Sequence, residues 1–269
     1  MSDRKTFVVE HPAQLWRTET RREFLRLLGV GGSIVMLPAV LASCGDDDDD
    51  GMRPPPNTGV TLNLSTETGI LNYAYALEQL EAAFYTQVVA SSVFGTLTAE
   101  LQEVFTDLRN HEVAHREFLK AALTPANAIA SLSVNQSTFT TALANRDSIL
   151  KTSEQFEDLG VAAYNGAGKY LTGTNLMLAG KIVSVEARHA AAIRDIRDAL
   201  GITGGAGVNT RFAGDDVVDS NGRDVVLEPA NVRGRVASAN VLSTTLTIGT
   251  NPPTRAGSGA EFGPPNPTP

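Results

Sequence analysis

The segment "LRNHEVAHREFL", residues 108–119, decides which fold and which chemistry the sequence encodes. Its centre, "HEVAH", matches H-E-x-x-H, the zinc-peptidase signature in which two histidines of one helix hold the metal. The same letters contain Glu112-x-x-His115, and residues three apart share one face of a helix. A glutamate and a histidine at this spacing are also half of the set that holds two metal ions inside a four-helix bundle. The rest of the sequence must distinguish these two interpretations.

Apolar residues recur with a helical period in four segments between residues 66 and 201. The links between the first two and between the last two are short, which predicts two antiparallel hairpins. The link between the second and third is long enough to cross back along the bundle, so the sequence predicts an all-α four-helix bundle. Thr98 and Thr174 are expected N-caps, and Gly201 is an expected helix stop. The helices are expected at about 66–91, 98–122, 147–171 and 175–200.

Carboxylates lie where the bundle should have its core. Glu78, Glu112, Glu157 and Glu186 each sit among apolar residues on an inward stripe. Burying an unpaired carboxylate costs several kcal/mol, so each needs a cation or a proton. Lysine and arginine fall on other faces of these helices, and two divalent cations would balance four carboxylates. The pattern therefore indicates a buried metal site.

The spacing of these residues occurs twice, once in each hairpin. Each first helix carries a glutamate seven residues before a tyrosine, and each second helix carries a glutamate three residues before a histidine. Glutamates from two helices and E-x-x-H pairs from the other two form the ligand set of dinuclear carboxylate bundles. The pairs are Glu78 and Tyr85, Glu112 and His115, Glu157 and Tyr164, and Glu186 and His189.

Four segments carry a family resemblance. They are "ALEQLEAAFY", "HEVAHREFL", "SEQFEDLGVAAYNGA" and "VSVEARHAAAIRDI", and together they resemble the helices of ferritin-like proteins, in particular the exported desiccation-related family. The resemblance covers about residues 66–201 and is loose beyond them. It implies that Glu78 and Glu157 are terminal ligands, that Glu112 and Glu186 bridge two metals, and that His115 and His189 give each metal one nitrogen. It also implies that Tyr85 and Tyr164 either hydrogen-bond the ligands or are redox-active.

Other acidic and histidine residues leave alternatives open. Glu81 and Glu154 lie three residues from the chosen glutamates and are candidates for further ligands, proton shuttles or rim residues. A zinc peptidase would need His111 and His115 on one metal and a third ligand elsewhere. The extended peptidase motif fails because its glycine position holds Phe118. A peptidase also leaves the second E-x-x-H unexplained, so we expect His111 at the rim of the site.

Composition excludes some partners. The 269 residues carry a formal net charge of -8, which argues against binding nucleic acid. The only cysteine, Cys44, excludes an internal disulfide framework and a cysteine-based zinc site.

The N-terminus has the form of an export signal. Residues 1–43 contain paired arginines at 21–22, an apolar stretch too short to span a membrane, and small residues before Cys44. "TRREFLR" resembles the twin-arginine motif, which exports folded proteins, and "LASC" resembles a lipidation site. We expect a lipid anchor at Cys44 that holds the protein at a membrane of the periplasm or cell envelope.

The remaining segments flank the expected bundle. Residues 44–65, rich in aspartate and proline, are expected to be a flexible linker. Residues 202–269 form a Gly/Pro-rich extension, with a hairpin expected around Asn221-Gly222, a short helix expected from Pro229, and a disordered end.

These observations predict an exported protein that binds two iron ions, or alternatively two manganese ions. The expected chemistry is redox reaction with dioxygen or peroxide, as ferroxidase, peroxidase or catalase-like enzymes perform, in oxidative or desiccation stress. The alternative is a non-catalytic envelope protein that stores metal or protects surfaces, with the zinc peptidase as a minor alternative. The sequence leaves the oligomeric state open.

Overall fold

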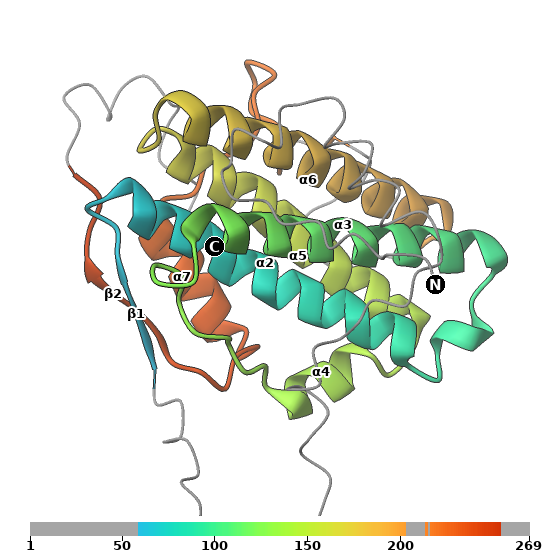
Figure 1. Cartoon of the computed structure of the whole chain (residues 1–269). Helices are drawn as coiled ribbons and strands as arrows, with labels where there is room; N and C mark the ends of the chain where they lie inside the picture. Colours follow the sequence, from blue (N-terminus) through green and yellow to red (C-terminus); the bar gives the residue numbers. More distant parts are fainter. Residues whose placement is uncertain (1–58, 203–212, 215, 254–269) are drawn as a thin grey trace, which may run out of the picture. The chain divides into compact units, whose positions relative to one another are not determined.

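The structure is a computed structural model that describes residues 59–202, 213–214 and 216–253 (Figure 1). The expected export signal, the lipidation site at Cys44, most of the expected linker and the end of the extension lie outside these residues. No helix of the described segments combines the length and apolar character that crossing a membrane requires.

The described part of the chain contains four long helices that confirm the predicted bundle (Figure 1). They form two pairs, because α2 packs along α3 and α5 packs along α6. Only the short 3-10 helix η3 (Phe94–Thr96) separates the first pair, so its helices run antiparallel. The four helices are α2 (Glu67–Ala90), α3 (Ala99–Leu123), α5 (Arg146–Gly168) and α6 (Gly173–Ala199).

Side chains cap three of the four long helices, α2, α3 and α5. The hydroxyl of Thr98 accepts a hydrogen bond from Leu101 N–H, which confirms the predicted cap of α3. The predicted cap at Thr174 is wrong, because α6 begins at Gly173 and its N-cap is Thr172. Gly201 adopts φ of 64° directly after α6, and this left-handed conformation ends the helix as predicted.

The crossover between α3 and α5 is held by buried polar side chains of α2. Asn72 accepts a hydrogen bond from Ile129 N–H, and Gln79 accepts one from Leu132 N–H. The crossover also contains the short helix α4 (Gln136–Ala142), whose Phe139 is buried. Its single core residue and its serine- and threonine-rich sequence gave no helical period from which to predict it.

The C-terminal extension packs on the bundle. Leu227 N–H donates to the carbonyl of Ala162 in the middle of α5. A Cβ at Gly166 would lie 1.8 Å from the carbonyl oxygen of Leu227, so only glycine allows this close approach. Arg194 of α6 binds Asp158 and Asp216 and so fastens the same extension to the helices.

The helix predicted in the extension is present, whereas the predicted hairpin and the predicted end of the linker differ from the structure. α7 (Pro229–Ser238) begins at the predicted proline. The chain reverses at Asn221-Gly222, where Gly222 has φ of 73°, but it forms a single bridge, Val218 with Asp224, in place of a hairpin of two strands. β2 (Leu246–Thr250) pairs in parallel with β1 (Val60–Asn63). The predicted linker, residues 44–65, therefore includes a strand at 60–63.

Candidate metal centre

All six residues predicted as ligands meet in the middle of the bundle. α2 supplies Glu78 and α5 supplies Glu157, while α3 and α6 each supply a glutamate and a histidine one turn apart. The four glutamates are completely buried, with exposed fractions of 0%. They are joined by His115 and His189, whose side chains are 13% and 8% exposed.

Within the described part of the chain, two groups of four residues place one ligand atom each within 4.8 Å of one another. The first position joins Glu78 and His115 to two further glutamates, and the second joins Glu157 and His189 to the same two glutamates. The shared residues are Glu112 and Glu186. The centre therefore consists of two adjoining positions with a common pair of carboxylates.

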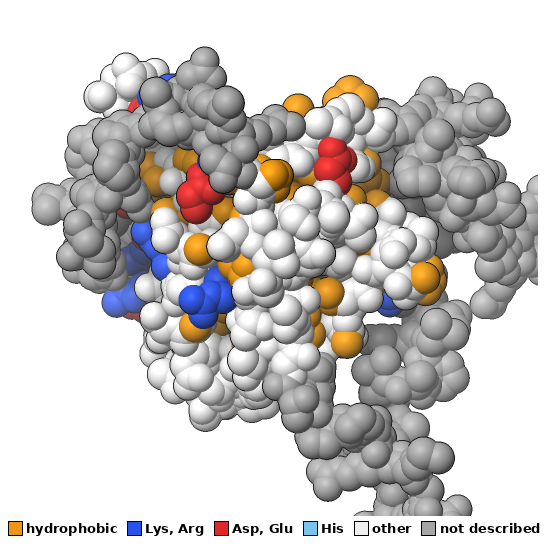
Figure 2. Space-filling view, turned by 90° about the vertical axis from the view of Figure 1, so that its left-hand side faces the viewer, with side chains coloured by type: hydrophobic (Ala, Val, Ile, Leu, Met, Phe, Trp, Pro, Cys, Tyr) orange, Lys and Arg blue, Asp and Glu red, His pale blue; other side chains and the backbone are white. Residues whose placement is uncertain are grey.

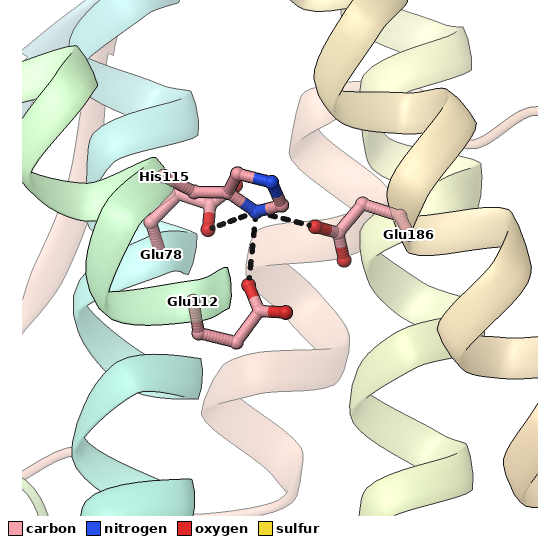
Figure 3. A group of neighbouring side chains, drawn as sticks. All are labelled: Glu78, Glu112, His115 and Glu186. Carbon is pink, nitrogen blue, oxygen red and sulfur yellow. Dashed lines mark hydrogen bonds and ion pairs between the residues drawn. The ribbon is translucent and has the colours of Figure 1, made fainter. Parts of the chain in front are cut away.

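The first position surrounds the ring nitrogen of His115 (Figure 3). Its Nδ1 lies 2.9 Å from Glu186 Oε1, 3.2 Å from Glu112 Oε2 and 3.5 Å from Glu78 Oε2. Figure 3 shows these three carboxylates approaching one nitrogen from three different helices. Such convergence is expected of atoms that share a cation.

The second position repeats this arrangement around His189. Its Nδ1 lies 2.8 Å from Glu112 Oε1 and 3.3 Å from Glu157 Oε2. The two oxygens of Glu112 thus face different histidines, which is the geometry of a carboxylate that contacts two ions.

Several of these atoms have no hydrogen bond despite their short separations. Glu78 Oε2, Glu157 Oε2 and both oxygens of Glu186 find no hydrogen-bond partner in the described segments, and neither does His189 Nδ1. Buried polar atoms without partners are rare in folded proteins and are a sign of an ion or water. Oxygen and imidazole donors suit divalent iron, manganese and zinc. The donor set therefore fits metal ions, and four carboxylates match the charge of two.

The tyrosines contact the centre across the bundle. Tyr85 of α2 donates to Glu157 Oε1 of α5 at 2.5 Å, and Tyr164 of α5 donates to Glu78 Oε1 of α2 at 2.5 Å. Each tyrosine therefore donates a hydrogen bond to the glutamate of the opposite hairpin, although the sequence pattern pairs it with the glutamate of its own helix. These hydrogen bonds leave the second oxygen of each carboxylate for a metal.

Burial and the contacts with the histidines shift the pKa values of the glutamates in different directions. Desolvation raises the pKa of Glu78 to about 7 against the contact with His115, and it also raises the pKa of Glu186 well above its usual value. Burial also acts on Glu112, but the close contacts with both histidines outweigh it and lower its pKa to about 2. The same contacts outweigh burial at His189 and raise its pKa to about 10. In the absence of metal the centre therefore holds protons in place of cations.

The three residues left open by the sequence have different surroundings. His111 lies outside both groups and on the exposed face of α3, where its Nδ1 is 2.9 Å from His189 Nε2. His111 therefore lies beyond His189, which is a candidate ligand. His111 and His115 thus do not share one metal position as a peptidase requires. Glu154 forms an ion pair with the buried Arg197. Glu81 is 3% exposed and lies beside Glu186.

Comparison with known proteins agrees with this geometry. The model of the ferritin-like domain family matches residues 66–199, which span all four long helices and all six candidate ligands. Residues 66–199 form a ferritin-like domain. A comparison with curated proteins gave no match to the chain.

The site residues predicted from the sequence do not include Gly160 of the ferritin-like domain. A Cβ at this position would lie 3.0 Å from Glu81 Oε1 and 3.1 Å from Glu186 Oε2. The signal was present in the sequence, since Gly160 follows Glu157 at the spacing at which Glu81 follows Glu78.

Proposed function

We propose that the ferritin-like domain binds two redox-active divalent ions and uses them in a reaction with dioxygen or peroxide. One observation supports the proposal: the two four-residue groups share Glu112 and Glu186, an arrangement that would suit a pair of ions. Iron is the first candidate and manganese the second, because both accept oxygen and imidazole ligands. When bound, the pair would supply electrons to the oxidant.

The roles of the six residues follow from their positions. Glu112 and Glu186 would bridge the ions, since both groups include them. Glu78 and His115 would complete one position, and Glu157 would complete the other with His189. The complete burial of the four glutamates keeps bulk water from the carboxylates and strengthens each charge interaction at the centre.

Tyr85 and Tyr164 would orient the terminal carboxylates. Each hydroxyl donates to one carboxylate oxygen, which fixes the rotation of the group and directs its free oxygen inward. Outer partners of this kind commonly tune metal affinity by about 10- to 100-fold. Their burial beside the centre also supports a role for the tyrosines as redox-active groups.

Anaerobic loading with ferrous ion followed by mixing with oxidant tests the reaction. We expect wild-type protein to oxidise two ferrous ions per chain faster than free iron in the same buffer, and a comparison of dioxygen with hydrogen peroxide names the oxidant. Glu186→Ala should lose this activity, whereas Glu103→Gln at an exposed position of α3 should keep it. Bound iron that is oxidised no faster than free iron would favour the storage or protective role instead.

We also propose that the protein is exported and lipid-anchored through Cys44. The paired arginines and the apolar stretch before the only cysteine support this location. Cys44→Ala should release the protein from the membrane fraction and abolish incorporation of labelled fatty acid. Equal membrane association of both forms would contradict the anchor.

A further inference from the structure

The six candidate ligands and the two tyrosines match between the halves of the metal centre, but a position between the glutamate and the tyrosine does not. α2 and α5 carry equivalent glutamates and equivalent tyrosines, with identical spacing. Between them, at the third residue after the glutamate, α2 has a glutamate and α5 has a glycine. The series are Glu78, Glu81 and Tyr85 on α2, and Glu157, Gly160 and Tyr164 on α5.

These two unequal positions face each other across the bundle. Tyr164 bonds Glu78, and Tyr85 bonds Glu157, so α2 and α5 run antiparallel past each other at the centre. The midpoint of this crossing falls at residues 81 and 160. The contacts agree, because Glu81 Oε1 lies 3.0 Å from the place that a Cβ on Gly160 would occupy.

Glu81 therefore extends into room that the glycine leaves open. On the same side lies Glu186 Oε2, 3.1 Å from that Cβ position, while Glu186 Oε1 faces His115. The Glu81 side chain is 3% exposed, and its Oε2 finds no hydrogen-bond partner in the described part of the chain. Burial and the neighbouring Glu186 raise the pKa of Glu81, so the group is costly to keep as a bare anion.

We propose that Glu81 is a fifth carboxylate of the metal centre and that Gly160 is the residue that admits it. This inference rests on the proposed binding of two ions. A glutamate at both positions would place two carboxylates in the space that one fills, and a larger residue at 160 would displace Glu81. The chain thus adds one negative group to an otherwise symmetric site.

One unmatched carboxylate makes the two metal positions unequal. The six paired ligands give each position the same types of donor atom. Glu81 attracts a cation more strongly to the position that its carboxylate reaches, either by direct contact or through Glu186. We therefore expect the ions to bind in two separable steps, with Glu81 responsible for the difference.

Titration of the full-length metal-free protein with Mn²⁺, followed by the electron paramagnetic resonance signal of free Mn²⁺, tests this. Wild-type protein should bind two ions per chain in two steps. Glu81→Gln keeps the shape of the side chain but not its charge, and it should weaken the tighter step by about 10- to 100-fold while leaving the stoichiometry at two. Glu103→Gln, an exposed change of the same kind, should leave both steps unchanged.

Gly160→Ala supplies an independent test that removes no charge. The new methyl group should displace the Glu81 carboxylate and weaken the same step, whereas helix propensity favours alanine by about 1 kcal/mol, so the variant should fold. If Gly160 acts through Glu81, the double variant should bind Mn²⁺ as Glu81→Gln does. If the losses of Mn²⁺ affinity in the two single variants add fully in the double variant, Gly160 does not act through Glu81.

The outcomes separate this inference from the proposed function. Two ions bound by wild type with unchanged affinities in Glu81→Gln would overturn the role of Glu81 and leave the dinuclear site intact. Failure of wild-type protein to bind Mn²⁺ or Fe²⁺ would overturn both.

Discussion

Replacing Glu78 with glutamine should stabilise the metal-free protein and weaken its response to metal. Burial raises the pKa of Glu78 from 4.5 to about 7, against the contact with His115. A shift of this size corresponds to roughly 3 kcal/mol of unfavourable free energy when the carboxylate is ionised in the folded protein. Glutamine has the same shape, and its amide oxygen can still accept the hydrogen bond from Tyr164.

The pH dependence has a definite sign. The folded protein holds the proton of Glu78 more tightly than the unfolded chain does, so this residue makes stability fall as the pH rises. The loss begins near pH 4.5 and is complete above about pH 7. Glu78→Gln should therefore match wild type below pH 4.5 and exceed it by up to roughly 3 kcal/mol above pH 7.

Urea unfolding followed by circular dichroism measures the difference. In chelator above pH 7 the variant should have the higher free energy of unfolding, and with Mn²⁺ present the order should reverse because only wild type has its full ligand set. Glu103→Gln should differ from wild type by about 0.5 kcal/mol or less under both conditions. A Glu78→Gln variant that is less stable than wild type in chelator at every pH would show that the buried carboxylate of Glu78 does not destabilise the metal-free protein.

Three further substitutions test other contacts. Tyr85→Phe should weaken Mn²⁺ binding by about 10- to 100-fold in a titration, because its hydroxyl orients a terminal carboxylate. His111→Ala should retain two ions per chain by mass spectrometry, whereas His115→Ala should lose at least one; equal losses would revive the peptidase site. Arg194→Ala should lower the free energy of unfolding by about 3 kcal/mol in urea, because it leaves two aspartates without their buried partner.

The candidate ligand residues could be selected from the sequence because they conflict with their surroundings. A glutamate such as Glu112 on an apolar helical stripe is costly, and the period of 3.6 residues states which face it occupies. The same period places Glu112 and His115 together. Local spacing was therefore sufficient to select both the bundle and its candidate ligands.

Contacts between helices could not be predicted in this way. Periodicity places Tyr85 on the inner face of α2 but does not say that it bonds Glu157 across the bundle. The register of α2 against α5, which also brings Glu81 to Gly160, depends on how the helices pack. The spacing from glutamate to tyrosine is identical in the two hairpins, so an interaction within each helix was enough to account for the sequence pattern.

The small sheet was hidden for a similar reason. β1 and β2 pair in parallel although Val60 and Leu246 are 186 residues apart, and neither strand can form without the other. The aspartates and prolines before β1 gave its whole neighbourhood the composition of a linker. In the structure Leu62 and Leu64 are buried, so the last residues of that segment belong to the folded part.

We propose that one chain holds two metal ions between Glu112 and Glu186. The most direct test is the metal content per chain, by plasma mass spectrometry, of protein purified without chelator from its own host. We expect about two iron or manganese ions per wild-type chain if both positions are filled. One zinc ion per chain, or no metal even after anaerobic loading with iron, would contradict it.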